Sequence, residues 1–442
     1  MGGESVMSSI PKGYKKTEVG VIPESWDVKN LESICELLNG YAFKAKNYSI
    51  NGEFKVITIT NIQRGFFTTS CVNYISFLPI DIQKHQILDI GDILISMTGT
   101  IVGHIARVNE INCLLNQRVG KLKFNKNVDT NFIYSVLNRI EFETCMTSIA
   151  AGGAQVNLNK NDILSYQVSL PPLPEQKAIA KVLSDMDALI EAQKALLAKK
   201  KDIKQGAMQD LLSGHVRLPG YETKGWKHTD IGEIPDDWEV KILGEEGVFL
   251  TTSSYTRSDL REYGDVACIH YGDIHTRFHT WLDCSSIELP MISKDMVKQY
   301  PYLRNGDLVI ADASEDYEGL GDCVEICNMG SKLCIGGLHT IVYRARPALF
   351  APFYIGLLRN LQVVRNQLVS QAVGTKVYSL TTSMIGAISV PIPSLLPEQK
   401  AIAQVLSDMD NEIETLEAEL EKLNHMKRGM MQELLTGRIR LV

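Results

Sequence analysis

Apolar residues recur at helical spacing over two long stretches of the chain, and both stretches begin with almost the same sequence. Residues 173–186 read LPEQKAIAKVLSDM, and residues 396–409 read LPEQKAIAQVLSDM. The two stretches keep one register as far as MQDLLSG at 208–214 and MQELLTG at 431–437. A match of this length does not follow from composition, so the chain contains two copies of one helical element.

Each copy carries the start and stop signals of a single long helix. Pro174 and Pro397 suit the first helical turn, where a missing N–H costs nothing. Gly214 and Gly437 are the expected stop residues. The pattern therefore predicts two helices of about 40 residues, each roughly 60 Å long at ~1.5 Å per residue.

The apolar rows of these helices predict that the two pack together. The second helix has a heptad seam formed by Ile402, Met409, Leu416, Leu423 and Met430 with Leu406, Ile413, Leu420 and Leu434. The first helix is less regular, with one row of Val182, Leu189, Leu196 and Ile203 and another of Leu183, Ile190 and Leu197. In an antiparallel pair, the interrupting Gln193 and Lys200 should lie at an edge of the shared core or face a docked subunit. The alternative is two surface helices, each packed on its own domain.

The segments before the two helices begin alike. Residues 13–26 read GYKKTEVGVIPESW, and residues 225–238 read GWKHTDIGEIPDDW. Each half of the chain therefore has the same order: an entry segment, a variable body and a long helix. This is internal repetition at the scale of a domain.

The first body, about residues 27–170, alternates short β-branched runs with turns. The runs at 54–60, 90–96, 101–108 and 119–124 predict strands, and helical spacing appears at 131–146. In the second body, about residues 239–390, matching landmarks follow in the same order at 305–311, 353–369 and 372–377. Between the landmarks the bodies barely resemble each other, which suggests related scaffolds that read different targets.

Composition narrows the class of protein only slightly. With 442 residues the chain predicts about three domains at ~150 residues each. No run approaches the ~18 apolar residues of a membrane span, and residues 1–9 lack the features of a signal peptide, so we expect a soluble cytoplasmic protein without membrane contact. The net charge of −7 leaves DNA binding open, because the footprint of a protein on DNA depends on local clusters of Lys and Arg.

Neither cysteines nor histidines form a convincing metal site. Nine cysteines, an odd number without secretory context, indicate reduced thiols. Cys323, Cys327 and Cys334 precede His339, but a CxxC knuckle is missing, which favours buried neutral cysteines. Three histidines, at 270, 275 and 279, lie in a segment that is expected to form strand and turn, which would not hold them on one face. We expect neither metal nor cofactor.

Motifs for catalysis are absent from the sequence. It lacks a phosphate loop, a complete dinucleotide fingerprint and a Gly-x-Ser-x-Gly elbow. The Asn/Asp-Pro-Pro-Tyr/Phe element of amino-group DNA methyltransferases is also missing, so we expect no catalytic residues. Scattered carboxylates leave a cryptic nuclease site as the alternative.

Loops of both bodies combine the side chains that read base edges and hold phosphates. In the first body the candidates are Asn39, Tyr41, Lys44, Lys46, Asn61, Gln63, Arg64, Thr98, Thr100, Gln117, Arg118, Gln155, Asn157 and Lys160. In the second body they are Ser253, Ser254, Tyr255, Arg257, His270, Tyr271, His275, Arg277, Lys376 and Tyr378. Taken singly, each loop also fits an ordinary solvated turn. Only its place in the duplicated architecture favours a role in DNA binding.

Taken together, these motifs resemble a known family. The LPEQ helices, the IP…W openings, GDILIS-x-TGTIVG and NQRVGKL resemble the specificity subunit of type I restriction–modification systems, from Gly13 onward. The resemblance implies two target-recognition domains that each read half of a split site in double-stranded DNA. It also implies methyltransferase subunits, expected to be two, and endonuclease/translocase subunits as partners, with no catalysis by this chain.

The implied fold is α+β, with two similar recognition domains separated by two long helices that pair as an antiparallel coiled coil, and an internal pseudo-twofold repeat. The expected boundaries are 1–170 for the first domain with an N-terminal extension, 171–220 for the first spacer helix, 221–392 for the second domain and 393–442 for the second spacer helix. Where the first body has MTGTIVG, the second has DASEDYEGLG, so no contact role is transferred to Asp312 or Ser314. The alternatives are a self-sufficient DNA methyltransferase and a coiled-coil adaptor without a DNA role.

Overall fold

The computed structural model describes residues 10–152, 156–222, 225–278, 280–374 and 376–441. The chain divides into two compact units: Met1–Lys194 with Glu419–Val442, called unit 1, and Ala195–Ala418, called unit 2. Each unit thus combines one variable body with parts of both long helices. Two predicted residues, Gln155 and His279, lie outside the described residues.

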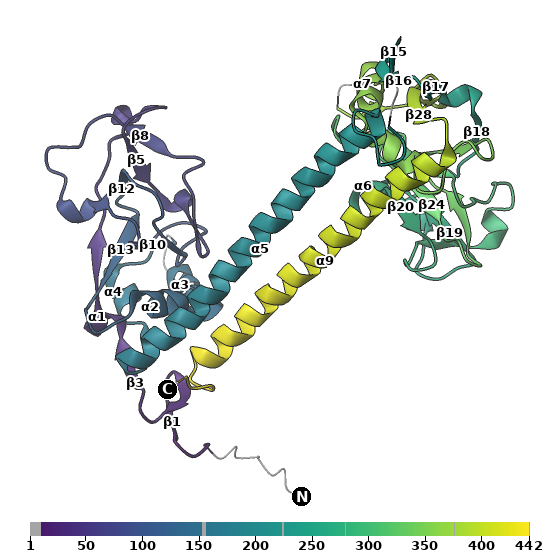
Figure 1. Cartoon of the computed structure of the whole chain (residues 1–442). Coiled ribbons are helices and arrows are strands. Elements are labelled where there is room, and N and C mark those ends of the chain that lie inside the picture. The colour runs from purple at the N-terminus through teal and green to yellow at the C-terminus, as the bar shows by residue number, and fades with distance from the viewer. Residues whose placement is uncertain (1–9, 153–155, 223–224, 279, 375, 442) are drawn as a thin grey trace, which may run out of the picture. The chain divides into compact units, whose positions relative to one another are not determined.

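The two long helices are continuous. Helix α5 spans Leu173–Ser213 and α9 spans Leu396–Leu434 (Figure 1). The start and stop signals in the sequence predicted both helices, and this prediction is confirmed. None of the helices in the described ranges has the length and apolarity needed to cross a bilayer.

In unit 2, α5 and α9 are joined by ion pairs. Lys204 pairs with Asp410, and Lys200 Nζ lies 2.6 Å from Glu412 Oε1. The lysine that comes earlier on α5, Lys200, contacts the residue that comes later on α9, Glu412. These segments of the two helices therefore run in opposite directions, and Lys200 has a polar partner at the edge of their contact.

In unit 1, a similar pair of polar contacts joins the other ends of these helices. Gln193 Nε2 donates a hydrogen bond of 3.0 Å to Glu419 Oε2, and Lys427 Nζ lies 2.5 Å from Asp187 Oδ1. The order is again opposite along the two helices. Gln193 therefore also contacts the partner helix through polar atoms, as expected for an edge position.

The predicted apolar rows of α5 need one correction. Leu189, Leu196 and Ile203 are 50%, 40% and 46% exposed, whereas Leu183 and Ile190 are buried. The two rows differ by one residue, which is ~100° of rotation on a helix. Val182 and Leu183 still share the core of unit 1, but from Leu189 onward the first row faces solvent.

The first body contains two main sheets, in the orders β11-β10-β13-β4 and β8-β5-β12-β9. Its strands are β1 (Tyr14–Thr17), β2 (Gly20–Pro23), β3 (Asp27–Asn30), β4 (Cys35–Asn39), β5 (Phe54–Ile57), β6 (Ile62–Gln63), β7 (Phe66–Phe67), β8 (Asn73–Ile75), β9 (Ile87–Leu88), β10 (Ile93–Ser96), β11 (Ile105–Arg107), β12 (Cys113–Leu115), β13 (Val119–Phe124) and β14 (Gln167–Leu170). Its helices are α1 (Leu31–Ile34), α2 (Thr130–Leu137), α3 (Ile140–Ala151) and α4 (Lys160–Leu164). Side chains of α2 and α3 share one core with the start of α5, and Figure 1 shows these helices beside the start of α5.

The second body repeats this arrangement, with main sheets in the orders β18-β26-β22-β24-β20 and β21-β19-β25. Its strands are β15 (Trp226–Thr229), β16 (Gly232–Pro235), β17 (Trp238–Ile242), β18 (Gly247–Leu250), β19 (Val266–Ile269), β20 (Trp281–Asp283), β21 (Met291–Ile292), β22 (Leu308–Ala311), β23 (Ala313–Ser314), β24 (Cys323–Cys327), β25 (Leu333–Gly336), β26 (Thr340–Ala345), β27 (Tyr378–Ser379) and β28 (Ser389–Pro393). Its helices are α6 (Tyr271–Thr276), α7 (Gln362–Gln371) and α8 (Thr382–Gly386).

The two bodies have equivalent strand pairings. The order β11-β10-β13-β4 corresponds to β24-β22-β26-β18, and the parallel pair β5–β12 corresponds to β19–β25. Every residue of β10 and of β22 is buried, which explains why both strands read as continuous apolar runs rather than as alternating patterns. An α+β fold was predicted, and both bodies mix helices and sheets.

Some local predictions differ from the structure. The segment 131–146 forms two helices, because α2 ends at its C-cap Asn138 and Arg139 begins α3 as an extended N-cap. The segment 270–279 was predicted as strand and turn, but it contains helix α6. The side chain of His270 caps that helix by accepting a 3.3 Å bond from the N–H of Gly272, a local signal that the apolar pattern does not carry.

The repeated motifs meet in unit 1. The buried carboxylate of Glu175, from the first LPEQ, accepts a 3.0 Å bond from Trp26 Nε1 and a 2.8 Å bond from Arg440 Nη2. Arg440 follows Gly437 by three residues. The tryptophan of the entry segment, the glutamate of one helix and the arginine after the other helix thus form one cluster.

Unit 2 contains the equivalent three residues, but its tryptophan does not donate to the glutamate: Trp238 Nε1 is buried and has no hydrogen-bond partner among the described residues. Glu398, from the second LPEQ, is 2% exposed and accepts a 2.9 Å bond from Arg217 Nη2. The guanidinium of Arg217 also lies over the ring of Trp238, 5.5 Å from its centroid. Burial raises the pKa of Glu398, and Arg217 opposes that effect.

The glutamine of each LPEQ holds the neighbouring chain. Gln176 accepts a 2.8 Å bond from the N–H of Asp129 and donates one of 2.8 Å to Pro171 O. Gln399 accepts a 2.9 Å bond from the N–H of Ala351 and donates one of 2.9 Å to the carbonyl of residue 393. The LPEQ motif therefore fixes each body to a helix start.

Candidate nucleic-acid interface

Backbone hydrogen bonds bring the predicted loops of the first body together. The N–H of Tyr41 donates to Leu115 O at 2.8 Å, and the N–H of Gln117 donates to Tyr41 O at 3.0 Å. This joins the loop after β4 to the loop between β12 and β13. Two predicted loops, separated by some seventy residues in sequence, are therefore neighbours.

A second set of bonds adds the loop after β10 and the segment after α3. The N–H of Met97 donates to Arg118 O at 3.1 Å, and the N–H of Leu158 donates to Met97 O at 2.8 Å. Thr98 forms a β-bridge with Asn157. Arg118, Thr98 and Asn157 consequently belong to one surface, which we call the first loop surface.

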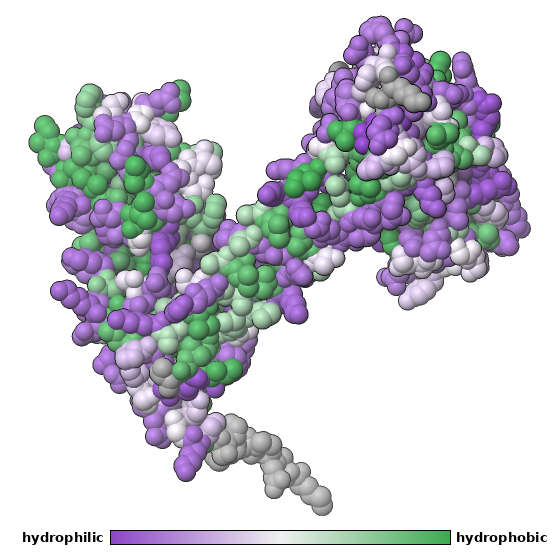
Figure 2. Space-filling model, viewed as in Figure 1, coloured by the Kyte–Doolittle hydropathy of each residue, from purple (hydrophilic) through white to green (hydrophobic). Residues whose placement is uncertain are grey.

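Most candidates on this surface are accessible and several are basic. The exposed ones are Asn39, Lys44, Lys46, Thr100, Gln117, Arg118, Asn157 and Lys160. Tyr41 is partly buried, and its hydroxyl donates a 2.7 Å bond to Asp81. In the segment that precedes Asp81, Phe77 and Ile80 are 86% and 106% exposed, and Figure 2 shows apolar side chains gathered at the end of unit 1 that carries β5 and β8.

Asn61 has an internal role instead. It is 1% exposed, and its Nδ2 donates to Thr68 O and Cys71 O at 3.0 and 3.2 Å. Its Oδ1 accepts from both the N–H and the hydroxyl of Thr58, at 2.8 and 3.0 Å. Two donors and two acceptors exhaust the amide, so Asn61 shapes its loop and has no hydrogen-bonding capacity left for a base.

Two further candidates of the first body have internal partners. Gln63 Nε2 donates to Thr60 O at 3.0 Å. Arg64 Nε lies 2.9 Å from Glu143 Oε2, and the other oxygen of that carboxylate is 3.4 Å from His104 Nε2. Arg64 is thus part of an ion cluster that ties its loop to α3.

The second body has loops at equivalent places. The N–H of Asp312 donates to His339 O at 3.1 Å, and the N–H of Leu380 donates to Asp312 O at 2.8 Å. These bonds repeat the pair that Met97 makes in the first body. Because Asp312 follows β22 as Met97 follows β10, the two loop frames are the same.

Tyr378 and Lys376 are part of this second loop surface. Tyr378 pairs with Ser314 across the short sheet β23–β27, and its ring stacks on that of Tyr317 with centroids 4.0 Å apart. Lys376 is exposed. Although no contact role was transferred to Ser314 from the sequence, the structure places it directly opposite a candidate residue.

The other candidates around β19 differ in accessibility. Ser254 is exposed, whereas Ser253 is 3% exposed and its N–H donates to Gly336 O at 2.9 Å. Tyr255 is partly buried, and its hydroxyl donates a 2.7 Å bond to Met296 O. Tyr271 is also partly buried.

Two candidate arginines share one carboxylate. Arg257 Nη1 and Arg277 Nη1 lie 2.5 and 3.3 Å from the oxygens of Asp273, which is 2% exposed. Both guanidinium groups remain about half exposed. They can therefore meet a phosphate while Asp273 fixes their position.

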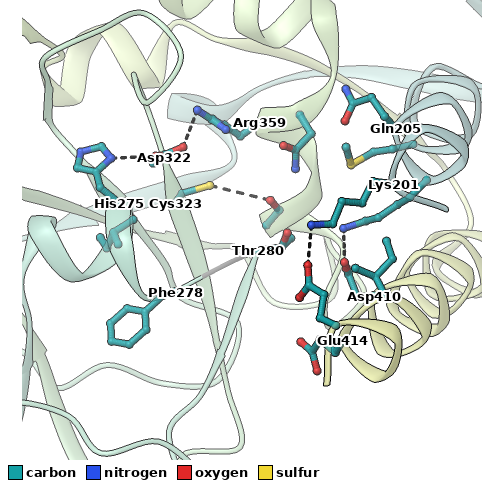
Figure 3. Close-up of a pocket in the computed structure, with 17 residues that line it drawn as sticks. Lys201, Gln205, His275, Phe278, Thr280, Asp322, Cys323, Arg359, Asp410 and Glu414 are labelled. Atoms are coloured by element: carbon teal, nitrogen blue, oxygen red, sulfur yellow. Dashed lines mark hydrogen bonds and ion pairs between the residues drawn. The ribbon is translucent and has the colours of Figure 1, made fainter. Parts of the chain in front are cut away.

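The candidate histidines are held internally. His270 is 8% exposed and burial lowers its pKa, which suits its role as a neutral cap acceptor. His275 Nδ1 lies 2.8 Å from Asp322 and Nε2 lies 2.9 Å from Ala313 O. Figure 3 shows His275 pointing toward Asp322, which also contacts Arg359 at 2.5 Å. The three side chains border a cavity of about 450 Å³ beside the segments of α5 and α9 in unit 2.

Sequence reasoning missed two residues on the second loop surface. His339 precedes β26 as Arg118 precedes β13, and both strands have six residues. Tyr317 supplies the ring under Tyr378. The strand bounds that reveal the position of His339 and the stacking that reveals Tyr317 both come from the fold, so no sequence signal pointed to either residue.

The cysteines are free thiols, and no group of three or more His, Cys, Asp or Glu side chains in the described ranges has the arrangement of a metal site. Burial raises the pKa of Cys323 and of Cys327 to about 12. These thiols are therefore neutral at ordinary pH, as buried cysteines were predicted to be.

Comparison with known proteins agrees with the duplicated architecture. A model of the type I restriction modification DNA specificity domain matches residues 23–200 and 235–425. The chain is 29% identical to the putative type I restriction enzyme MjaX specificity subunit of Methanocaldococcus jannaschii, over 97% of each chain. It is 27% identical to the MjaVIII specificity subunit of the same organism, over 95% of this chain and 94% of that protein.

A solved structure shares the fold. The crystal structure of the type I restriction-modification system S subunit from M. genitalium superposes with a TM-score of 0.52. The alignment covers 92% of this chain and 96% of that one at 14% identity. At this identity the likeness concerns the fold alone.

Proposed function

The chain belongs to the type I restriction–modification DNA specificity family, and on this premise we propose that each of its two bodies reads one half of a split site in double-stranded DNA. One observation carries the proposal. The two loop surfaces are built on the same backbone hydrogen bonds, through Met97 in one body and Asp312 in the other, but they present different side chains. A shared frame with different side chains is the arrangement expected of two readers with two targets.

We propose that the accessible candidates make the DNA contacts. In the first body these are Asn39, Tyr41, Lys44, Lys46, Gln63, Arg64, Thr98, Thr100, Gln117, Arg118, Asn157 and Lys160. In the second body they are Ser254, Tyr255, Arg257, Tyr271, Arg277, Lys376 and Tyr378. The lysines and arginines suit phosphates, and the amides, hydroxyls and Arg118 suit base edges.

The long helices are proposed to form an antiparallel coiled coil that relates the two halves by a pseudo-twofold axis. The opposite order of the α5–α9 contacts within each unit supports this, as do the two equivalent Trp–Glu–Arg clusters. The proposed divisions are residues 1–170, 171–220, 221–392 and 393–442. The helices would then set the distance between the half-sites.

The partners are proposed to be methyltransferase subunits, two in number, with endonuclease/translocase subunits in the full complex. Leu196 and Ile203 on α5 support a docking role for the helices, because exposed apolar side chains at heptad spacing suit contact with another protein. The chain itself is a recognition subunit and not the catalyst. Modification of DNA then depends on subunits that this chain positions.

The test is a change of recognition domain in the assembled complex. The full chain is co-expressed with its methyltransferase subunits, and methylated sites are mapped across the genome. Replacing residues 239–390 with the corresponding domain of a relative should change one half of the methylated motif and leave the other half intact. A change in both halves would refute the proposal of two independent readers.

A separate assay addresses the alternative of a self-sufficient methyltransferase. Purified chain without partners is incubated with duplex DNA and adenosylmethionine, and methyl transfer is measured. We expect transfer only after methyltransferase subunits are added. Robust transfer by the chain alone would contradict its assignment as a recognition subunit.

A further inference from the structure

The loop between β25 and β26 holds a histidine in a conformation that side chains rarely adopt. His339 has φ of +56°, in the left-handed region that favours glycine and tolerates asparagine. Its carbonyl accepts a 3.1 Å bond from the N–H of Asp312. Its Nδ1 lies 3.1 Å from Asp312 Oδ1. One residue therefore fixes both the backbone and the ring of His339.

The ring is fixed but remains accessible. Half of the His339 side chain is exposed, and the ring of Tyr271 meets it edge to face with centroids 5.3 Å apart. Since a carboxylate only accepts, Nδ1 is the donor in the bond to Asp312. In the neutral ring, Nε2 is then an acceptor, and within the described ranges it has no protein partner. The unfavourable backbone thus presents one acceptor atom in a fixed position.

The position of this atom in the fold corresponds to Arg118. Arg118 is the last residue before β13, and its carbonyl accepts from the N–H of Met97 at 3.1 Å. His339 is the last residue before β26, and its carbonyl accepts from Asp312 at the same distance. The loop frame is therefore equivalent. Arg118 presents a permanently charged guanidinium with several N–H donors, whereas His339 presents one acceptor nitrogen, Nε2.

We propose that His339 reads a base in the second half-site, with Asp312 as its positioning residue. This rests on the proposed function of the second body as a DNA reader. The acceptor Nε2 fits the exocyclic amino group of adenine or cytosine in the major groove, whereas Arg118 fits O6 and N7 of guanine. The two bodies thus use one place in the frame for opposite hydrogen-bonding roles.

The first test maps methylation by the complex that contains His339→Asn. Asparagine tolerates the left-handed backbone but is too short to replace the imidazole. We expect one position of one half of the motif to become degenerate, while the other half is unchanged and reports that the complex is assembled. Arg118→Ala should relax one position of the opposite half. His228→Asn, an exposed histidine on β15, serves as the control and should leave the motif intact.

A second test identifies the atom that is read. At the degenerate position, the amino-bearing base is replaced by its analogue without the amino group, purine for adenine or 4-unsubstituted pyrimidinone for cytosine. Binding of this duplex by the wild-type complex should weaken about tenfold, and binding by the His339→Asn complex should not weaken further. Asp312→Ala should lose discrimination between the two duplexes, and Asp312→Asn, which keeps an acceptor, should retain part of it.

The outcomes separate the inference from the proposed function. An unchanged split motif with His339→Asn overturns the inference alone, and so does loss of methylation at every site, because His339 would then support folding rather than base choice. Equal loss of affinity for the analogue in wild type and variant also overturns it. A wild-type complex that methylates no split motif overturns the proposed function itself.

Discussion

The two bodies use one backbone frame but reverse the charge at one of its anchor points. Arg107 on β11 and Glu325 on β24 occupy equivalent places, opposite Ile93 and Leu308 in the sheet register. Arg107 donates to Asn131 Oδ1 at 2.7 Å and to a nearby backbone carbonyl. Glu325 instead accepts bonds from the N–H groups of residues 353 and 356, at 2.7 and 3.1 Å. The difference shows that the frame constrains which segments are joined and not the sign of the charge that joins them.

One ion cluster in each body shows a comparable reversal, in which the carboxylate and the arginine exchange segments. In the first body Arg64 and His104 meet the carboxylate of Glu143, whereas in the second His275 and Arg359 meet that of Asp322. In each case the cluster joins a loop to the helical part of its body. The carboxylate lies on helix α3 in the first body and on the loop before β24 in the second, so the two clusters join similar segments with the charges exchanged.

The largest predicted loss of stability comes from removing the arginine of one Trp–Glu–Arg cluster, which tests whether the two bodies are fixed to their helices equally. Arg217→Ala leaves Glu398, which is 2% exposed, without its cation, and removing one partner of a buried pair costs about 3–5 kcal/mol. Arg440→Ala should cost less, about 1–3 kcal/mol, because Trp26 Nε1 still donates a 3.0 Å bond to the buried carboxylate of Glu175 when the arginine is gone. Urea unfolding, with hydrogen exchange to assign the loss to a unit, measures both.

The exposed Arg428 on α9 provides the control, since its replacement by alanine should change stability by less than about 0.5 kcal/mol. Equal losses for Arg217→Ala and Arg440→Ala would mean that the bond from Trp26 does not compensate for the lost arginine. A loss near zero for both would contradict their role in fixing bodies to helices.

The reversed anchor predicts a pH effect confined to unit 2. Burial raises the pKa of Glu325 to about 7, above its ordinary value of 4.5. A raised folded-state pKa contributes stability that is complete below pH 4.5 and is lost as pH rises through 7, because the folded state binds the proton more tightly. We expect unit 2 to lose about 2–3 kcal/mol over this range relative to Glu325→Gln.

Hydrogen exchange of the two units at several pH values measures this effect. Unit 1 is the internal control, because arginine at the equivalent position keeps its charge throughout. A stability slope that is the same in wild type and Glu325→Gln would show that the carboxyl group does not titrate in this window.

The sequence was most informative where the pattern is local. Strand β13 has the predicted bounds, and α5 and α9 begin and end close to the prolines and glycines that mark them. Long-range pairing was not accessible in the same way, because apolar runs do not specify their partners. The parallel contact of β5 with β12 and the split of segment 131–146 into two helices depend on tertiary contacts and on caps.

For the candidate interface, sequence reasoning found the loops but not the state of each side chain. Arg118 and Gln117 are exposed as a contact residue must be, whereas Asn61 has the right chemistry but is saturated by its own loop. His339 was noticed as a possible metal ligand and not as a loop residue. Its role depends on Asp312, whose approach is set by strand order and not by any spacing in the sequence.

The smallest predicted effect concerns the two glycines that end the long helices. It tests whether equivalent substitutions in the two repeats change the free energy of unfolding equally. Gly214 and Gly437 have φ of +76° and +72°. A Cβ on them would lie 2.6 Å from Pro235 and 2.5 Å from Pro23, the prolines of the two entry segments. Alanine at either position should therefore cost about 1–2 kcal/mol from the backbone conformation alone.

Because the surroundings are repeated, Gly214→Ala and Gly437→Ala should cost the same within error, unlike the two arginine variants. Gly206 and Gly429 are matched controls inside the same helices, with open space around the added methyl group. Alanine at these two positions should raise stability by up to about 1 kcal/mol, through helix propensity. Urea unfolding of all four variants measures these free energies. A large difference between Gly214→Ala and Gly437→Ala would show that one entry segment shifts to accommodate the methyl group and the other does not. The two repeats would then share their geometry but not their stability.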